Sequence, residues 1–392
     1  MRVLVTHNYY RSALASGENE VVAAEVEALR TAGVEVDTYF RSSDEIETFP
    51  PFQRAMLPIR PIYSSEDARA IRRRIQEKRP DVVHLHNPFP LISPYVVRIA
   101  KSEGVPVVQT VHNYRHSCPA GDFFRNGAPC EDCSGKAVPW PAVAHGCYRD
   151  SRPQSAVMAA AARLHRTTWL MVDRFLPVSE FIAQHLVKSG IPRERIVVRP
   201  NSTQPRGTVR APNSGFVFIG RLTPEKGASL LVSAWMESGV WRTERLVVAG
   251  DGPERDLVLA ARDYNVHYVG SVDRARVLTL LDEAAIVVVP SLCYEGFPRI
   301  VAESFERGRP VAATAIGALN ELITPDVGWT APPEPIAFAK MLNVAASDST
   351  LQTKGLAARA LYESKLTPLV TTASLLDLYE TLRAGRSSQS GS

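Results

Sequence analysis

Cys293 to Arg307 reads C-Y-E-G-F-P-R-I-V-A-E-S-F-E-R, and this stretch decides the fold of the chain. It follows an apolar run that ends at Val289 and predicts a buried parallel strand, and it continues into a helical pattern. Gly296 permits a sharp turn, and Pro298 suits the first position of a helix because its missing N–H is no loss there. We therefore expect a strand, a tight loop and a helix whose free amides and positive dipole end face an anion.

Two glutamates in this stretch lie eight positions apart. We expect Glu295 in the loop and Glu303 about a turn and a half into the helix. The segment can therefore hold a phosphate group with one carboxylate beside it and another behind it. This combination suits a phosphorylated sugar donor better than a metal ion or a nucleic acid.

Strand and helix patterns alternate along nearly the whole chain, which predicts parallel sheets with helices on both faces. The expected strands are 3–6, 34–40, 81–84, 106–111, 174–178 and 196–198 in the first half, and 216–219, 245–249, 267–269, 285–289 and 310–313 in the second. The main expected helices are 18–32, 94–103, 155–172, 179–189 and 366–384. The predicted fold class is α/β, with two doubly wound, Rossmann-like domains that face each other across a cleft.

A stretch rich in proline, glycine and small polar residues, 200–215, predicts a linker between the two domains. It separates an N-terminal domain, 1–199, which carries a cysteine-rich insert at 116–148, from a C-terminal domain, 216–364. A last helix is expected within 365–385. The Ser/Gly-rich end, 386–392, predicts a disordered tail.

The bulk composition excludes several classes of protein. The net charge of +4 and the pI of about 8.8 are well short of a nucleic-acid-binding signature. No apolar run approaches the roughly 20 residues needed to span a bilayer, and the N-terminus predicts a strand and not a signal peptide, so we expect a cytoplasmic protein. One basic run, 72–79, leaves two hypotheses open. It is either a solvated helix face or a surface attracted to an anionic acceptor or to the inner face of a membrane.

The second half opens with F-V-F-I-G-R-L-T-P-E-K-G, residues 216–227. Arg221 falls just beyond the predicted strand, and Thr223 and Pro224 predict an N-cap and a first helical residue. Lys226 would then lie in the first helical turn, where a cation meets the positive end of the dipole at a cost of about 0.3–1 kcal/mol. An anionic ligand removes this conflict, so we predict that Arg221 and Lys226 bind phosphate. Two surface cations, one of them paired with Glu225, are the alternative.

Other positions fall near the same predicted edges. Gly17 precedes a helix, and its amide either approaches a ligand phosphate or belongs to an ordinary loop. His112 follows a strand, and we favour a ligand-facing role for it over a structural one. The turn L-V-V-A-G-D-G, 246–252, is a weak signal alone but lies at the edge that carries Arg221. No D-x-D triplet occurs, so Arg221, Lys226 and helix amides would neutralise a leaving pyrophosphate in place of a metal ion.

The motifs G-R-L-T-P-E-K-G, G-D-G and E-G-F-P-R-I-V-A-E, in this order and spacing, resemble those of the family 4 glycosyltransferases. These are retaining, nucleotide-sugar-dependent enzymes of the GT-B fold, and the resemblance covers nearly the whole chain. It implies that the N-terminal domain takes the acceptor, that the C-terminal domain binds the nucleotide sugar, and that the last helix crosses back to the N-terminal domain. The chain departs from many members at Ser16, where they have a second glycine, and at Pro298, where they have glycine.

The resemblance also implies a role for each site residue. Arg221 and Lys226 would bind the donor pyrophosphate. Glu295 would contact the hydroxyls of the donor sugar, and Glu303 would hydrogen-bond the ribose. His112 would lie beside the donor sugar, near the reacting carbon. The predicted catalytic residues are thus His112, Arg221, Lys226 and Glu295. The remaining predicted donor-binding residues are Gly17, Gly250, Gly252, Gly270, Gly296, Phe297, Pro298 and Arg299.

Four of the five cysteines form a C-x11-C-x2-C-x13-C pattern. They are Cys118, Cys130, Cys133 and Cys147. Such a pattern can form a tetrahedral zinc site, and the segment around it is rich in glycine, proline and aspartate and has little core of its own. In a cytoplasmic protein a metal is favoured over a disulfide. A structural zinc site and reduced thiols in a loop that shapes the acceptor pocket are both left open.

The sequence therefore predicts a retaining glycosyltransferase that moves a hexose-type sugar from a nucleotide-diphosphate sugar to a glycan, lipid-linked or small-molecule acceptor, with no metal in catalysis. We expect front-face attack through an oxocarbenium-like state, with the departing phosphate assisting deprotonation of the acceptor. The alternatives are a nucleotide-sugar epimerase of similar fold and a non-catalytic nucleotide-sugar-binding subunit. A dehydrogenase is not expected because no G-x-G-x-x-G follows the first strand.

Overall fold

The computed structural model describes residues 1–13, 16–206 and 214–389. The chain divides into two compact units. Unit 1 comprises Met1–Gly121, Glu131–Asn201 and Pro368–Ser392, and unit 2 comprises Asp122–Cys130 and Ser202–Thr367.

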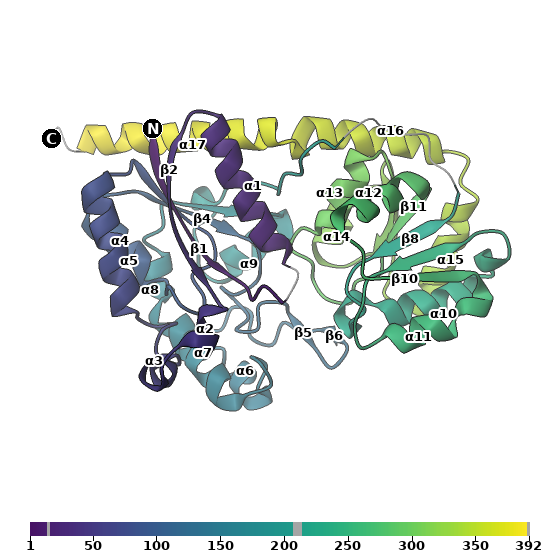
Figure 1. The fold of residues 1–392 in the computed structure, drawn as a ribbon, viewed down its shortest axis with the longest axis horizontal. Coiled ribbons are helices and arrows are strands. Elements are labelled where there is room, and N and C mark those ends of the chain that lie inside the picture. The colour runs from purple at the N-terminus through teal and green to yellow at the C-terminus, as the bar shows by residue number, and fades with distance from the viewer. Residues whose placement is uncertain (14–15, 207–213, 390–392) are drawn as a thin grey trace. The chain divides into compact units, whose positions relative to one another are not determined.

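Unit 1 is built on a five-stranded sheet in the order β2-β1-β3-β4-β7, and every neighbouring pair of strands is parallel. Its strands are β1 (Arg2–Tyr9), β2 (Glu35–Ser42), β3 (Val82–Leu85), β4 (Val107–Val111) and β7 (Arg174–Pro177). Its helices are α1 (Gly17–Thr31), α2 (Glu45–Thr48), α3 (Pro51–Met56), α4 (Ser65–Lys78), α5 (Tyr95–Ser102), α6 (Trp140–His145), α7 (Arg152–Leu164), α8 (Arg166–Trp169), α9 (Glu180–Lys188) and α17 (Pro368–Gln389), as Figure 1 shows. The strand order reverses between β1 and β3, so ligands of this unit are expected beyond the carboxyl ends of those two strands.

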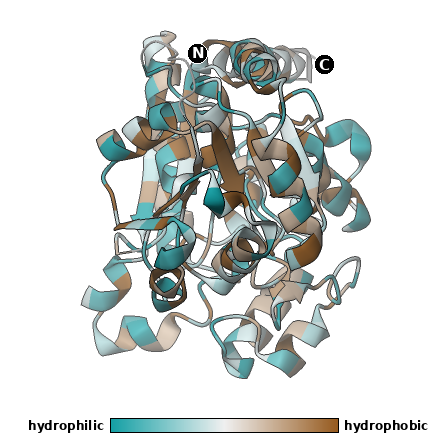
Figure 2. Ribbon diagram, turned by 90° about the vertical axis from the view of Figure 1, so that its right-hand side faces the viewer, coloured by the Kyte–Doolittle hydropathy of each residue, from teal (hydrophilic) through white to brown (hydrophobic). Residues whose placement is uncertain are grey.

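The core of unit 1 joins the two ends of the chain. Helix α1 starts at a cap where the Ser16 hydroxyl accepts the N–H of Asn19, and its apolar face packs on β1. Leu375 and Tyr379 of α17 are fully buried in the same cluster as Val3 of β1. The last helix is therefore part of the hydrophobic core of unit 1. Figure 2 shows hydrophobic colouring on strand segments and hydrophilic colouring on many helical turns.

Unit 2 contains a six-stranded parallel sheet in the order β10-β9-β8-β11-β12-β13. Its strands are β8 (Phe216–Ile219), β9 (Leu246–Ala249), β10 (Val266–Gly270), β11 (Ile286–Val289), β12 (Val311–Thr314) and β13 (Gly328–Ala331). Its helices are α10 (Ala228–Ser238), α11 (Arg255–Ala260), α12 (Arg274–Glu283), α13 (Arg299–Glu306), α14 (Gly317–Leu322), α15 (Pro335–Ala346) and α16 (Leu351–Leu361). The order reverses between β8 and β11, as in dinucleotide-binding sheets. The predicted α/β class with two doubly wound domains is thus confirmed.

Two glycines hold the loops of this edge close together. Gly250, which follows β9, has a φ of 136°, and a Cβ there would lie 1.7 Å from the carbonyl oxygen of Gly220. Gly227 has a φ of 73°, and a Cβ there would lie 1.9 Å from the carbonyl oxygen of Pro290. Any other residue would clash with backbone and strain its own backbone. The loops after β8, β9 and β11 can therefore meet only because these positions carry no side chain.

Several predicted elements differ from the structure. Residues 196–198 form no strand, only an isolated bridge between Ile196 and Phe175. The expected helix 155–172 is broken at His165 into α7 and α8. Helix α17 continues to Gln389, into the predicted tail at 386–392, and the last three residues lie outside the described ones. Of the predicted linker, 207–213 also lies outside the described residues. Strand β13 was not predicted.

The sequence predicted Lys226 in the first turn of the helix after β8. In the structure Lys226 lies before α10. Pro224–Lys226 forms a short 3-10 turn of its own, and Gly227 in the left-handed conformation separates it from the helix. The cause is the close approach of Gly227 to Pro290, which the sequence pattern does not reveal.

Candidate functional site

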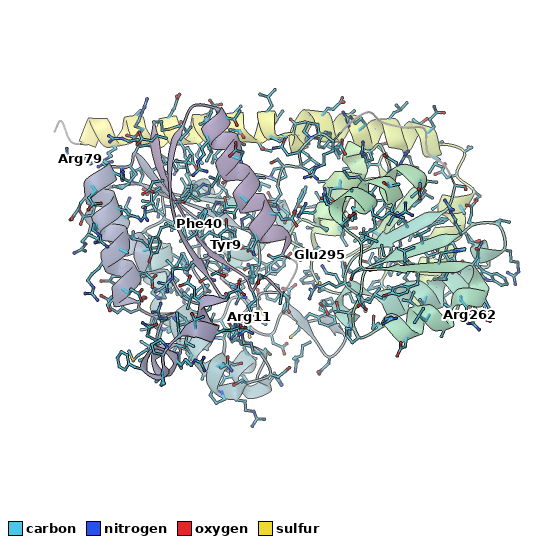
Figure 3. All side chains as sticks on the ribbon, in the orientation of Figure 1. Tyr9, Arg11, Phe40, Arg79, Arg262 and Glu295 are labelled. Atoms are coloured by element: carbon cyan, nitrogen blue, oxygen red, sulfur yellow. The ribbon has the colours of Figure 1, made fainter. Side chains whose placement is uncertain are left out.

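Unit 2 places two of the predicted site residues in direct contact beyond β8 and β11. Lys226 follows β8, and its Nζ lies 2.7 Å from Oε1 of Glu295, in the loop after β11. Glu295 is labelled in Figure 3. The hydroxyl of Ser291 donates to the same carboxylate oxygen at 2.6 Å. Because β8 and β11 flank the reversal of strand order, this ion pair lies at the topological switch point of the sheet.

Backbone hydrogen bonds fix the two loops to each other. The N–H groups of Leu292 and Cys293 donate to the carbonyl oxygen of Glu225, at 2.9 and 3.3 Å. The carboxylate of Glu225 accepts a hydrogen bond from Arg221 at 3.1 Å, which is the pairing that the surface-cation alternative expected. The Arg221 side chain is 52% exposed, so this pair is weak and its guanidinium is accessible to a ligand.

Burial and pairing act against each other in the Lys226–Glu295 pair. Burial alone would lower the pKa of Lys226, but the carboxylate of Glu295 outweighs it and the pKa is raised. Burial alone would raise the pKa of Glu295, but Lys226 and the hydroxyl of Ser291 outweigh it and the pKa is lowered. Both groups are therefore charged at neutral pH, and the loop offers a fixed ammonium beside a fixed carboxylate.

Glu303 of α13 is held by two arginines. Its Oε1 lies 2.6 Å from Arg274 at the start of α12 and 3.0 Å from Arg299, one turn earlier in α13. The Glu303 side chain is 5% exposed, so these contacts fix its orientation. The sequence analysis missed Arg274, which directly follows Asp273, the N-cap of α12 in the structure.

The predicted backbone positions of unit 2 lie on the same edge of the sheet. Phe297 is buried, and Pro298 is the N-cap of α13, so the helix begins one residue later than predicted. The N–H of Gly250 donates to the carbonyl of Gly270 at 2.8 Å, which closes the turns after β9 and β10 against each other. Gly252 and Gly296 lie in the loops after β9 and β11.

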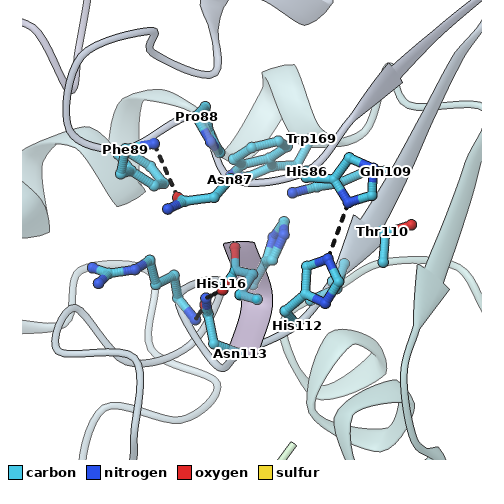
Figure 4. A pocket seen from close by; sticks show the side chains of 13 residues that line it. His86, Asn87, Pro88, Phe89, Gln109, Thr110, His112, Asn113, His116 and Trp169 are labelled. Carbon is cyan, nitrogen blue, oxygen red and sulfur yellow. Dashed lines mark hydrogen bonds between the residues drawn. The ribbon is translucent and has the colours of Figure 1, made fainter. Parts of the chain in front are cut away.

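In unit 1, His112 lines a pocket at the carboxyl end of β4 (Figure 4). Its Nε2 lies 3.0 Å from Nδ1 of His86, which follows β3, and the two rings are stacked. Nε2 of His86 lies 3.2 Å from Oε1 of Glu25 in α1. A carboxylate at that position favours the His86 tautomer with its proton on Nε2. His86 then accepts from His112, so the Nδ1 of His112 carries a lone pair.

That Nδ1 of His112 is buried and has no hydrogen-bond partner among the residues that the structure describes. Burial lowers the pKa of His112 well below its usual value, and His86 and His7 add to this effect. His112 is therefore neutral at physiological pH, and Nδ1 can accept a hydrogen bond from a ligand hydroxyl.

Glu25 anchors this chain of histidines. Its Oε2 accepts from the guanidinium of Arg199 at 2.5 Å, and its Oε1 lies 3.4 Å from Nδ1 of His84. Burial alone would raise the pKa of Glu25, but Arg199 and the histidines outweigh it and hold the pKa well below its usual value. The hydroxyl of Tyr379, in α17, lies 2.6 Å from Nδ1 of His84. The sequence analysis missed Glu25 and Arg199.

Glu25, His84 and His86 are the one group in the described part of the chain whose possible metal-ligand atoms all lie within 4.8 Å of one another. The surroundings do not fit a metal ion. Arg199 already neutralises the carboxylate, and both ring nitrogens of His84 have partners, Tyr379 and Thr110. A cation here would face a buried guanidinium, so we interpret the cluster as a hydrogen-bonded network.

The zinc site predicted for the cysteines is not supported. Cys118, Cys130, Cys133 and Cys147 form no group of three with ligand atoms within 4.8 Å, among the residues described. Residues 122–130, which include Cys130, belong to unit 2, where β5 (Phe124–Arg125) and β6 (Ala128–Pro129) form a small hairpin. Phe123, at 1% exposure, packs edge-to-face against Tyr294. Side-chain packing therefore orders this part of the insert, a feature that cysteine spacing cannot reveal.

Glu18 also lines the His112 pocket and was not predicted. Its Oε2 accepts from the hydroxyl of Tyr10 at 3.2 Å and from the amide of Asn113 at 3.3 Å. Its Oε1 is buried with no partner among the described residues. Burial raises the pKa of Glu18, although Arg115 opposes this shift. Gly17, the first residue of α1, directly precedes it, so the start of α1 brings a carboxylate as well as a backbone amide to this edge.

Acid is expected to destabilise unit 1. Burial, assisted by His86, lowers the pKa of His7 from 6.5 to about 3. Between these values the unfolded chain binds a proton that the folded chain does not. The free energy of unfolding should therefore fall by about 1.4 kcal/mol per pH unit for this histidine, as the pH decreases below 6.5. Urea unfolding between pH 7.5 and 5 should show a shallower pH dependence in His7→Gln. The exposed control His267→Gln should keep the slope of the parent, and an unchanged slope in His7→Gln would contradict this assignment.

Two of the five cations in the basic run pair with carboxylates. Arg72 lies 3.3 Å from Glu103, and Arg74 lies 2.8 Å from Asp37. These pairs favour the solvated helix face over an anion-binding surface. No helix in the described residues is both long enough and apolar enough to cross a membrane.

Comparison with protein families finds two adjacent matches. Residues 16–202 match the family model described as "Glycosyl transferase 4-like domain", and residues 213–348 match the one described as "Glycosyl transferases group 1". An uncharacterized glycosyltransferase of Methanocaldococcus jannaschii is 33% identical over 131 residues, which are 31% of this chain and 33% of that protein. D-inositol 3-phosphate glycosyltransferase 1 of Catenulispora acidiphila is 30% identical over 265 residues, 62% of this chain and 58% of that protein. The chain thus spans less than two thirds of these curated relatives.

Solved structures share the fold over nearly the full chain. The Anabaena protein Alr3699/HepE, solved in complex with UDP, superposes with a TM-score of 0.64, covers 97% of this chain and 100% of its own, and is 14% identical. At this identity the likeness shows the arrangement of two parallel sheets and no more.

Proposed function

Because this chain belongs to the group 1 glycosyltransferases, the family 4 enzymes of the GT-B fold, we propose that it transfers a sugar from a nucleotide-diphosphate sugar to a hydroxyl of an acceptor. The observation that carries the proposal is the Lys226–Glu295 pair at the switch point of unit 2. It offers a positive charge for the diphosphate and, at the same place, a carboxylate that accepts hydrogen bonds from sugar hydroxyls.

In this proposal unit 2 binds the donor. Arg221 and Lys226 bind the pyrophosphate, and the backbone amides at the start of α13 add further donors to phosphate and sugar. Glu295 accepts from hydroxyls of the transferred sugar, which we propose to be a hexose, and Glu303 accepts from the ribose. The turns at Gly250–Gly252 and Gly270 border the base. The UDP complex of the Anabaena protein supports a nucleoside diphosphate as the shared part of the ligand.

Unit 1 takes the acceptor molecule in this proposal, and Nδ1 of His112 accepts a hydrogen bond from a ligand hydroxyl. The positive charges fixed by Arg221 and Lys226 stabilise the phosphate as the bond to the sugar breaks, so no metal is needed for catalysis. The acceptor hydroxyl attacks from the face of the leaving group, its proton passes to the departing phosphate, and the configuration at the reacting carbon is retained. A glycan, a lipid-linked sugar and a small metabolite are all acceptors of this class, and we place the reaction in the cytoplasm or at the inner face of its membrane.

A screen of nucleotide sugars by thermal shift, followed by product analysis, tests the proposal. A donor at 100 times its dissociation constant stabilises the protein by about 2.7 kcal/mol. Turnover should persist with EDTA, and NMR should find the anomeric configuration of the donor in the product. An inverted anomer would rule out the front-face route. Turnover of donor into an epimer without acceptor would identify an epimerase, and binding without any turnover would identify a non-catalytic subunit.

Replacing Arg274 by glutamine should weaken the binding of the nucleoside diphosphate about tenfold, because Glu303 loses one of the two guanidinium groups that orient it. Calorimetric titration of the diphosphate measures the change. Arg276→Gln is the matched control, since Arg276 lies on the same helix and pairs with Glu283 at the surface. Equal losses in the two variants would show that Arg274 has no specific role.

A further inference from the structure

Unit 1 has a second pocket, beside the one that His112 lines. Residues from 115–119, 133–139, 162–170 and 189–191 line it, and the space between them, which is open to solvent, is about 750 Å³. The segment 133–139 belongs to the cysteine-rich insert, to which the proposed function gives no role.

The lining of this second pocket carries only positive charge. Arg115, Lys136 and Arg166 contribute cations, and no aspartate or glutamate lines it. Within the described part of the chain, Lys136 and Arg166 form no ion pair, and Nε of Arg115 is buried without a hydrogen-bond partner. His116 adds no charge at neutral pH, because burial lowers its pKa to about 4. We call this the basic pocket.

The basic pocket shares a wall with the His112 pocket. Arg115, His116 and Trp169 line both of them. Figure 4 shows His116 and Trp169 in the same pocket as His112. A ligand anchored in the basic pocket would therefore lie directly beside residues that also line the His112 pocket. The wall also includes the apolar side chains of Leu170 and Ile191, which suit an uncharged part of the same ligand.

We propose that the basic pocket binds a phosphate group carried by the acceptor, and that the acceptor is therefore a phosphorylated molecule. This inference rests on the proposed function, in which unit 1 takes the acceptor. Lys136 and Arg166, with Arg115 beside them, match a dianionic phosphate ester better than a single carboxylate, and guanidinium groups bind phosphate oxygens through paired, charge-assisted hydrogen bonds. The cysteine-rich insert then acts as a wall of the acceptor site without any metal.

Phosphate binding tests the proposal without requiring transfer. Inorganic phosphate, titrated at constant ionic strength and followed by thermal shift, should stabilise the parent protein. In Lys136→Gln/Arg166→Gln its apparent dissociation constant should rise about tenfold or more, as expected for the loss of charge-assisted hydrogen bonds. Arg163→Gln/Lys340→Gln removes the same net charge from exposed positions outside the pocket and should bind as the parent does. Equal affinity in all three proteins, or no stabilisation of the parent, would overturn the proposal.

Two further arms separate this site from the donor site and identify the source of the phosphate. Lys226→Met should weaken the binding of nucleoside diphosphate, and the pocket variant should leave it unchanged. The assignment of the donor site is thus tested separately from that of the basic pocket. Glucose 1-phosphate and decyl phosphate are then compared as probes. Tighter binding of the first indicates a soluble sugar phosphate, and tighter binding of the second indicates a lipid phosphate. If Lys226→Met no longer binds either probe while the pocket variant still binds them, phosphate binding belongs to the donor site alone.

Discussion

Lys226→Met is expected to lower donor turnover by about a hundredfold or more, because it removes a fixed positive charge that faces the leaving phosphate. The variant should also be less stable. Glu295 loses the ammonium group 2.7 Å away and stays largely buried, and its side chain is only 12% exposed. We expect a loss of about 2–4 kcal/mol in the free energy of unfolding, reduced by the partial exposure of the pair. All nucleotide sugars should be affected alike, since Lys226 would touch only the phosphates that they share.

The double variant Lys226→Met/Glu295→Gln separates stability from function. It removes both charges, so most of the lost stability should return, whereas turnover should stay low because neither the phosphate contact nor the sugar contact is restored. Denaturant unfolding and donor turnover of the same preparations measure the two effects. Lys340→Met serves as a surface control. Recovery of turnover in the double variant, or an effect confined to one sugar, would show that Lys226 does not bind the diphosphate.

Glu25→Gln is expected to have the second large effect, and it acts at a distance from any ligand. The shape of the side chain is kept, but Arg199 is left buried without its carboxylate, so the free energy of unfolding should fall by about 3–5 kcal/mol. Glutamine also no longer fixes the proton of His86 on Nε2, so the tautomer of His112 becomes mixed. Donor turnover should fall by about tenfold or more through this loss of orientation.

A measurement on the ring of His112 distinguishes this effect from mere instability. Long-range ¹H–¹⁵N correlation spectra of the parent should show His112 Nδ1 without a proton, and those of Glu25→Gln should show a shift toward the other tautomer. Glu27→Gln, an exposed glutamate two residues on in the same helix, is the matched control. If His112 keeps its tautomer in Glu25→Gln while turnover falls, Glu25 contributes to stability only.

The strands were predictable where an apolar run has clear boundaries. F-V-F-I at 216–219 was predicted residue for residue as β8, because glycines flank four apolar residues. G-W-T-A at 328–331 was missed as β13, because it begins with glycine and is less apolar than F-V-F-I. The break between α7 and α8 follows a long-range contact, in which His165 reaches the carbonyl oxygen of Ile62. No local sequence pattern predicts such a contact.

The site was predictable where loops follow strands, and much less so where helices bring charges inward. Arg221, Lys226 and Glu295 lie in the loops that follow β8 and β11, and their place at the sheet edge was expected. Glu25 and Arg274 lie on helices, where a charged residue is by default assigned to the solvent. They are instead oriented by partners far away in the sequence, such as Arg199, 174 positions from Glu25. Buried ion pairs of this kind require the tertiary structure.

The place of α17 has a consequence for synthesis of the protein. Tyr379 completes the core of unit 1 and contacts His84, yet the ribosome makes it only after the whole of unit 2. Residues 1–201 leaving the ribosome therefore lack the part of their core that Leu375 and Tyr379 provide, and unit 2 can finish folding first. An N-terminal fragment that stops at 201 should aggregate when expressed alone. The same fragment joined through a flexible linker to 368–389 should be the smallest piece that folds with an intact histidine network.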